Sequence, residues 1–303
     1  MDTEKFRNGA AYVGGKFVPF SEAAISVADW GFTRSDAVYD VVHVDDYRFF
    51  RLKDHVERFE ASMKKRRIDV GLSTQEIEVV LHRVVALSGL SSAYVAMVAL
   101  RGRPRVVGSR RPEDCTNHLV AYAVPWVDVI SKEMQETGAT LWISEHPRVP
   151  DASVDPAVKN YQWSDLTSAL FEAHDHGYET AVLCDAEGFV TEGPGFNVFV
   201  VKEGRLVTPD RGALPGITRK TILELCAELG VPHSIGPVSR SDLQSADEVF
   251  ISSSAGGVMP VRQVSDGGAL PGSGGTVFRS IREAYWSAHK RPLFSTPVEA
   301  VQA

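Results

Sequence analysis

The first part of the chain alternates short apolar runs with polar turns, which predicts strands before helices. Residues 11–13 and 16–19 flank Gly14-Gly15, a pair typical of a hairpin. The β-branched run that ends at Val44 and the apolar runs 94–100 and 119–124 predict three longer strands.

Two helices are predicted among these strands. Asp54 followed by Glu57 resembles a capping box, and apolar residues then recur at helical spacing. Ser73 and Glu76 form a second box, before a periodic stretch that stops at Gly89.

The pattern changes near residues 125–132, where strand signals stop and a polar stretch begins. Beyond it, strand–turn–strand units alternate with helices predicted over 163–176, from Gly216 to Gly230, and over 276–289. We therefore expect an α+β protein with a small N-terminal α/β domain (1–126), a linker (127–133) and a larger C-terminal domain (134–303).

Composition and charge narrow the functional classes. With 32 basic and 39 acidic residues the net charge is −7, which argues against a nucleic-acid partner. No apolar run is long enough to span a membrane, no secretory signal is evident, and the three cysteines lack metal or disulfide spacing. The nine histidines form no metal-like cluster, so we expect a cytoplasmic protein without a metal site.

Lys159 is the first candidate for chemistry. It follows a proline-bounded segment, with Val158 before it and Trp163 after it, and we expect a helix to begin nearby. A lysine held among apolar neighbours loses solvation, its pKa falls, and the neutral amine attacks carbonyl groups. Most lysines are nevertheless exposed surface charges.

Four further features suit an anionic or ring-nitrogen ligand. The helix start at Gly216 presents free N–H groups, and the hydroxyl-rich corner 252–257 follows a strand. Arg58 offers a bidentate fork, and Glu192 precedes a Gly-Pro-Gly turn. Each feature alone has an ordinary explanation as a turn, a loop or a surface charge.

Three motifs in register carry a resemblance. They are residues 155–163 (Asp-Pro-Ala-Val-Lys-Asn-Tyr-Gln-Trp), 192–197 (Glu-Gly-Pro-Gly-Phe-Asn) and 214–220 (Leu-Pro-Gly-Ile-Thr-Arg-Lys). With supporting matches at 50–58 and 254–258, the chain resembles the fold-type IV pyridoxal-phosphate aminotransferases from about residue 10 to 286. Within that group it is most similar to the (R)-selective amine:pyruvate transaminases.

The resemblance implies the fold, the cofactor and the cofactor's ligands. It implies two domains, the larger with a mixed, barrel-like sheet, pyridoxal 5′-phosphate in the cleft between them, and a homodimer. Lys159 would form the Schiff base and move the catalytic proton, while Glu192 would pair with the pyridine nitrogen. The phosphate ligands implied are Arg58, Ile217, Thr218, Ser253 and Ser254.

Substrate recognition is where the chain departs from the (R)-amine transaminases. Tyr39, Val41, Trp163 and Ala255 match pocket positions, but Arg34 replaces a histidine, and the arginine loop 101–111 is shortened. We expect Arg34, Arg105 or both to clamp a substrate carboxylate. Arg103 and Arg110 are alternatives, and all of these arginines could equally be solvated loop charges.

The expected function is transfer of an amino group from an (R)-amine or D-amino acid to a keto acid such as pyruvate. Two chemistries on the same fold compete: branched-chain L-amino acid transamination and aminodeoxychorismate lyase action. A non-catalytic protein that binds a phosphate ligand on this scaffold is the alternative from another class.

Overall fold

The computed structural model describes residues 4–299, and these group into two compact units. Unit 1 comprises residues up to 127, residues 158–161 and the segment from 291 onward, whereas unit 2 comprises 128–157 and 162–290. The predicted division kept 134–303 together and so differs for 158–161 and for the segment from 291, which join unit 1. Long-range packing rather than chain order decides which core a short segment joins.

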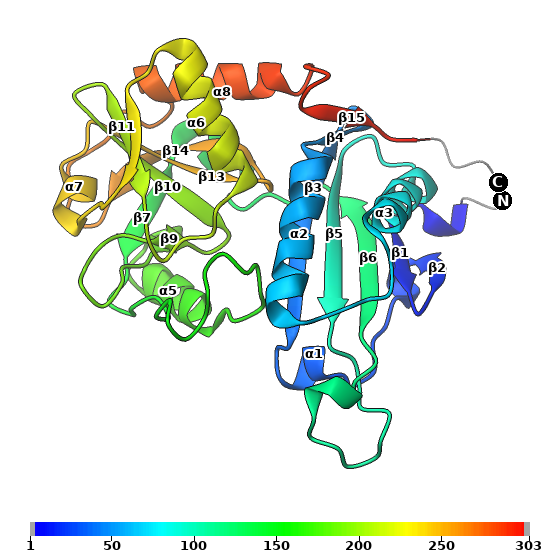
Figure 1. Ribbon diagram of the computed structural model, residues 1–303. Helices are drawn as coiled ribbons and strands as arrows, with labels where there is room; N and C mark the ends of the chain where they lie inside the picture. The colour runs from blue at the N-terminus through cyan, green and yellow to red at the C-terminus, as the bar shows by residue number, and fades with distance from the viewer. Residues whose placement is uncertain (1–3, 300–303) are drawn as a thin grey trace. The chain divides into compact units, whose positions relative to one another are not determined.

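Unit 1 is built on an antiparallel sheet of seven strands in the order β15-β4-β3-β5-β6-β1-β2 (Figure 1). The strands are β1 Ala10–Val13, β2 Lys16–Pro19, β3 Ala37–Asp45, β4 Arg48–Phe50, β5 Ala93–Leu100, β6 His118–Pro125 and β15 Ser295–Pro297. Its helices are α1 Trp30–Thr33, α2 Leu52–Arg66 and α3 Thr74–Ser88, with 3₁₀ turns η1 Glu4–Phe6, η2 Phe20–Glu22 and η3 Pro112–Asp114. The predicted hairpin and longer strands are confirmed.

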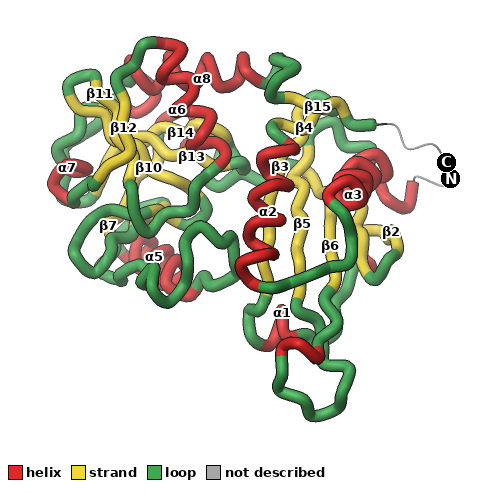
Figure 2. Tube along the Cα trace, in the orientation of Figure 1, coloured by secondary structure: helices red, strands yellow, loops and turns green. Residues whose placement is uncertain are grey.

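The two faces of this sheet have different partners. Helices α2 and α3 lie on one face (Figure 2), where Val42 of β3 joins Phe59 and Leu81 in the main core. Since successive side chains of a strand point to opposite faces, Tyr39 and Val41 belong to a separate cluster on the other face. The face with Tyr39 therefore carries side chains that α2 and α3 do not cover.

Of the two predicted capping boxes in unit 1, the structure contains one. The Ser73–Glu76 capping box is confirmed, but Asp54 does not cap α2. That helix begins at Leu52 after Arg51, which has a left-handed backbone (φ 55°) and whose Nε donates to Asp54 at 2.8 Å. The short helices α1 and α4 were not predicted, because they lack the length that periodicity needs.

Unit 2 contains a mixed sheet in the order β12-β11-β10-β13-β14-β7-β8, with β9 paired to β10. The strands are β7 Ala139–Ile143, β8 Thr180–Val182, β9 Glu192–Gly193, β10 Phe196–Lys202, β11 Arg205–Pro209, β12 His233–Gly236, β13 Glu248–Ser253 and β14 Gly257–Val264. The helices are α4 Lys132–Thr137, α5 Ser164–Asp175, α6 Ile217–Leu229, α7 Arg240–Gln244 and α8 Thr276–Ala288, with the 3₁₀ turn η4 Gly272–Gly274.

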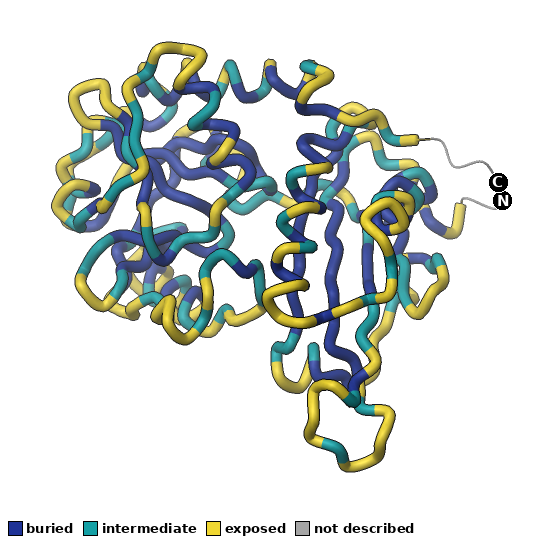
Figure 3. Tube along the Cα trace, viewed as in Figure 1, coloured by how far each residue is buried: buried dark blue, intermediate teal, exposed yellow. Residues whose placement is uncertain are grey.

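The strands of unit 2 alternate between two apolar environments, and their segments are largely buried (Figure 3). Val198 and Ile251 join the main core of the unit. Their neighbours in the chain, Phe199 and Phe250, stack with ring centres 4.9 Å apart, and the Phe250 ring contacts the Phe278 ring of α8. This arrangement holds the ends of β9, β10 and β13, and the α6 start that follows β11, on one rigid framework. The predicted two-domain α+β fold is confirmed.

Candidate active-site residues

Lys159 lies in the short segment of unit 1 that returns to the sheet edge beside β3. Its N–H donates to Ser62 Oγ at 3.3 Å, and its carbonyl accepts from the Tyr39 N–H at 3.0 Å. Val158 is buried in the main core, so the backbone on both sides of the lysine is fixed. The predicted helix onset lies further along, at Ser164. The amine is half-buried, with Nζ 4.5 Å from the centre of the Tyr39 ring.

Tyr39 belongs to a group of tyrosines in unit 1. Its ring stacks on Tyr161 at 4.3 Å with the planes 3° apart, and Tyr94 and Tyr122 stack at 6.5 Å. Burial raises the pKa of Tyr94, Tyr122 and Tyr161, so these phenols stay protonated and can donate hydrogen bonds. The predicted pocket residue Val41 joins Tyr39 in the same cluster, which combines apolar surface with phenolic donors.

Arg58 forms a bidentate pair with a buried carboxylate. Nε and Nη2 donate to Asp40 at 2.7 and 2.8 Å, and His55 Nδ1 lies 2.7 Å from Asp40 Oδ1. Burial alone would raise the pKa of Asp40, but the positive charge of Arg58 and the His55 contact outweigh it and hold that pKa well below its usual range. No sequence pattern indicated this network, because Asp40 lies within an apolar strand.

The candidate carboxylate ligands, Arg34 and three arginines of the loop 101–111, have different surroundings. Arg34 is exposed, and its guanidinium carbon lies 3.3 Å from the centre of the Trp30 ring. Arg105 donates from its backbone and side chain to the Asp114 carbonyl, and with Arg103 it lines a surface pocket of about 620 Å³. Arg110 is also exposed.

Arg101, at the start of that loop, has a structural role. It is buried, pairs with Asp36 at 2.9 Å, and donates to the carbonyls of Arg66 and Arg67, both at 2.6 Å. Arg34 and Arg105 thus keep accessible side chains, whereas the guanidinium of Arg101 is used structurally.

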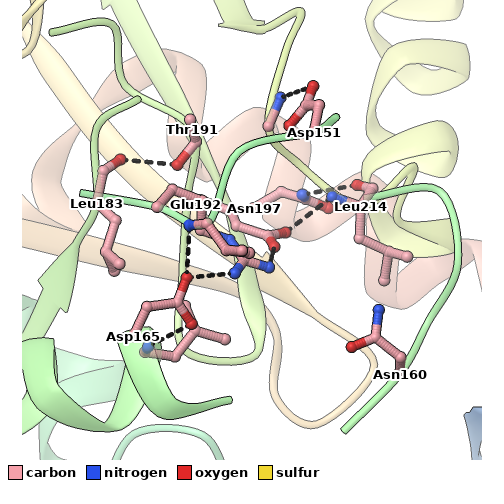
Figure 4. Close-up of polar contacts among 12 residues, drawn as sticks. Asp151, Asn160, Asp165, Leu183, Thr191, Glu192, Asn197 and Leu214 are labelled. Atoms are coloured by element: carbon pink, nitrogen blue, oxygen red, sulfur yellow. Dashed lines mark hydrogen bonds and ion pairs between the residues drawn. The ribbon is translucent and has the colours of Figure 1, made fainter. Parts of the chain in front are cut away.

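Glu192, in unit 2, is a buried carboxylate held from two sides (Figure 4). Its Oε1 accepts from Arg148 Nη2 at 2.9 Å, and its Oε2 accepts from the Leu214 N–H at 2.8 Å. Arg148 also donates to Asp165 at 2.6 Å. Burial alone would lower the pKa of Arg148, but Glu192 and Asp165 raise it.

Arg148 is a site residue that the sequence analysis missed. It lies in the loop between β7 and Lys159, where an isolated arginine resembles any solvated charge. Its side chain is only 10% exposed, and its Nε has no hydrogen-bond partner among the described residues. No local pattern predicts the pairing, because its partners lie 17 and 44 positions away in sequence.

The start of α6, where an anion site was predicted, is a helix N-terminus. Gly216 is the N-cap, with no side-chain cap and no acidic residue in the first turn, and Ile217 and Thr218 are buried. Arg219, also buried, donates to Thr208 Oγ1 at 3.1 Å and to the Pro209 carbonyl at 2.5 Å. These uncompensated N–H groups and this cation favour an anion.

The corner after β13 has the predicted turn. Ser253 Oγ accepts from the Ala255 N–H at 3.2 Å, and the Ala255 carbonyl accepts from Val129 at 2.9 Å. Ser254 lies in the turn itself. Ser252 Oγ is buried without a hydrogen-bond partner in residues 4–299. Trp163, predicted to line a pocket, directly precedes α5 as its N-cap residue.

No group of three or more His, Cys, Asp or Glu side chains within residues 4–299 could hold a metal ion. No helix in the same range has the length and apolar character to cross a bilayer.

Comparisons with known proteins agree on one class. The family model described as "Amino-transferase class IV" matches residues 37–264. The branched-chain-amino-acid aminotransferase of Escherichia coli (strain K12) is 31% identical over 284 residues, covering 91% of each chain, and that of Salmonella typhimurium matches equally. A crystal structure of the Escherichia coli branched-chain amino acid aminotransferase superposes with a TM-score of 0.87 at 29% identity, covering 96% of this chain and 99% of that one. A branched-chain amino acid aminotransferase solved with pyridoxamine 5′-phosphate gives a TM-score of 0.88 at the same identity, covering 97% of this chain and 100% of that one.

Proposed function

We propose, from the premise that this chain belongs to the class IV aminotransferase family, that it moves amino groups from branched-chain L-amino acids to keto acids. Its general activity is pyridoxal-phosphate-dependent amino transfer. The donor class is the proposal, and the names of its relatives support it.

The residues present fit a phosphorylated pyridine aldehyde. A half-buried amine is available at Lys159, a buried carboxylate at Glu192, and a helix start without acidic side chains at Ile217. The unpartnered hydroxyl of Ser252 adds a donor beside the turn that contains Ser254. These groups match an aldehyde, a ring nitrogen and a phosphate, respectively.

We assign each group one task. Lys159 would hold the cofactor covalently and would carry a proton at Nζ during amino transfer. Glu192 would bind the ring nitrogen, and Arg148 and the Leu214 N–H keep its carboxylate oriented. When bound, the cofactor supplies an electron sink for the bond that breaks at the substrate carbon.

The phosphate ligands proposed are Arg58, the N–H groups of Ile217 and Thr218, and the hydroxyls of Ser253 and Ser254. The helix dipole of α6 favours a dianion at its start. Asp40 holds Arg58 in one rotamer, which lowers the entropy lost when the guanidinium meets an anion.

The surroundings of Lys159 support an apolar substrate side chain. The cluster around Tyr39 and Val41 consists of aliphatic residues and tyrosines, including Tyr94 and Tyr122. A branched aliphatic group gains about 25 cal/mol for each Å² of apolar surface buried there. Arg34 and Arg105 are the proposed ligands for a substrate carboxylate, and Trp163 and Ala255 the proposed pocket residues in unit 2.

A second candidate is the predicted (R)-amine or D-amino acid transaminase. The comparisons support the branched-chain alternative better than this finer assignment. The same apolar, tyrosine-containing cluster is its supporting observation, because a simple amine has no carboxylate to neutralise.

A donor panel separates the two candidates. The holoenzyme is incubated with L-leucine or (R)-1-phenylethylamine and either pyruvate or 2-oxoglutarate as acceptor. D-Alanine is paired with 2-oxoglutarate alone, because its transfer to pyruvate regenerates the starting pair. The new amino acid is quantified by chiral chromatography. A kcat/KM for L-leucine at least tenfold above the others supports the proposal. Preference for (R)-1-phenylethylamine or D-alanine refutes it in favour of the second candidate.

We also propose a homodimer. Several large apolar side chains of unit 1 are exposed, among them Val27 (80%), Phe32 (65%) and Val107 (100%). Contiguous exposed apolar patches commonly mark interfaces, and Val107 lines the same surface pocket as Ala28, the chain neighbour of Val27. Analytical ultracentrifugation should give twice the chain mass of 33.1 kDa, and a monomer at micromolar concentration would contradict the proposal.

A further inference from the structure

One residue of unit 2, Leu214, has both its backbone N–H and its backbone carbonyl held by side chains of neighbouring strands. The Leu214 N–H donates to Glu192 Oε2 at 2.8 Å, and the Leu214 carbonyl accepts from Asn197 Nδ2 at 2.9 Å (Figure 4). Glu192 and Asn197 are themselves cross-strand partners in the β9–β10 pair. The backbone of Leu214 is therefore fixed to the sheet by two side chains that are cross-strand neighbours.

Leu214 lies just before the start of α6. The Gly216 N–H donates back to the same Leu214 carbonyl at 2.8 Å, closing a tight turn around Pro215, and α6 begins at Ile217. Only Pro215 and Gly216 lie between Leu214 and Ile217, the first residue of the helix. Any shift of that carbonyl moves the N-terminus of α6.

Asn197 also presses on the turn from the other side. A Cβ added at Gly216 would lie 2.1 Å from Asn197 Oδ1, far inside van der Waals contact. The backbone of Gly216 has φ −62°, which any residue adopts, so this close approach is the reason for glycine here. The Asn197 side-chain amide therefore has two contacts with the turn. Its Nδ2 donates to the Leu214 carbonyl, and its Oδ1 limits how closely Gly216 can approach β10.

We propose that Asn197 is a positioning residue that aligns the N-terminus of α6 with the Glu192 carboxylate. The inference rests on the proposed function, in which Glu192 takes the ring nitrogen and the α6 start takes the phosphate of one rigid cofactor. Those two groups lie at fixed separation in the ligand, so the protein must match that separation. Leu214 and Asn197 supply the link.

The first test compares ligands with and without the phosphate. Apo-protein is titrated with pyridoxal phosphate and with pyridoxal, followed by visible absorbance. Asn197→Ala removes the donor to Leu214, and losing one buried hydrogen bond corresponds to about tenfold. We expect pyridoxal phosphate to bind about tenfold more weakly, while pyridoxal changes less than twofold. An equal loss for both ligands, or no loss for either, overturns the proposal.

A matched control removes a similar hydrogen bond elsewhere. Thr191 Oγ1 is fully buried and donates to the Leu183 carbonyl at 2.9 Å, a hydrogen bond that does not involve residues 214–216 (Figure 4). Thr191→Val keeps the shape of the side chain and should leave unchanged the ratio of the affinity for pyridoxal phosphate to that for pyridoxal. If Asn197→Ala does not fold, Asn197→Asp keeps the side-chain size while removing the donor, and it must lower the same ratio.

A double-mutant cycle tests the contact with Gly216. Gly216→Ala alone should weaken pyridoxal phosphate binding at least tenfold, because its Cβ collides with Asn197. In the Asn197→Ala background the same change should add less than twofold, since the opposing oxygen is gone. Additive effects overturn the inference. Failure of the wild-type protein to bind pyridoxal phosphate would instead refute the proposed function.

Discussion

Replacing Asp40 by asparagine should destabilise the protein more than any ordinary surface change. Asp40 is fully buried and accepts two hydrogen bonds from Arg58, whose side chain is 10% exposed. The substitution keeps the shape but removes the counter-charge. Breaking a buried pair by deleting one partner costs about 3–5 kcal/mol, because the remaining charge is left without compensation.

The assay is equilibrium urea unfolding, followed by tryptophan fluorescence on the apo-protein at neutral pH. The control is the double variant Asp40→Asn/Arg58→Met, which removes both charges and keeps much of the apolar stem. We expect it to be more stable than Asp40→Asn alone, since no buried guanidinium remains. A loss below about 1 kcal/mol in the single variant, or strictly additive losses in the pair, would refute this account.

The pH dependence of the unfolding free energy tests the same prediction independently. The pKa of Asp40 is depressed in the folded state, so its contribution to stability is fully present above the unfolded value of about 3.9 and is lost as pH falls toward the folded value. The gap in unfolding free energy between wild type and Asp40→Asn should therefore shrink below about pH 4. A gap that stays constant there would mean that the ion pair is not its source.

Four other changes have defined outcomes. Lys159→Ala should abolish transamination and prevent fixation of the cofactor by borohydride, checked by mass spectrometry; a retained adduct would assign the amine elsewhere. Arg148→Met should weaken pyridoxal phosphate binding about tenfold or more by leaving Glu192 without its charged partner, with partial rescue by Arg148→Lys, both measured by titration. Burial lowers the pKa of His55 despite its acidic partner, so wild-type stability should fall as pH drops below about 6.5, and His55→Gln should flatten that slope in urea unfolding at pH 5–7. Arg34→Ala should raise KM for keto acids about tenfold; an unchanged KM would exclude Arg34 as a carboxylate ligand.

Local sequence patterns determined the elements that depend on neighbouring residues. The Gly14-Gly15 hairpin, the Ser73–Glu76 box and the α6 start at Gly216 all follow from backbone preferences within a few positions. The motifs around Lys159 and Glu192 were sufficient for the family, the fold and the cofactor, because each motif keeps its order and spacing along the chain.

Only the tertiary structure decided which charges are paired. Arg58 meets Asp40 across 18 positions, Arg148 meets Glu192 across 44, and Arg101 meets Asp36 across 65. In sequence each of these arginines resembles a solvated charge, since pairing depends on how strands and loops are brought together. The donor preference was predicted as (R)-amine or D-amino acid, whereas the relatives that match this chain are named branched-chain-amino-acid aminotransferases.

Asn197 illustrates the same division. Along the chain it is one polar residue at the start of an apolar strand, five positions after Glu192. Its meaning comes from the turn that leads into α6, which returns to it 17 residues later. Hydrophobic periodicity and capping residues act over a few positions and can be predicted from sequence, but a hydrogen bond between distant segments exists only once the packed core has fixed both partners.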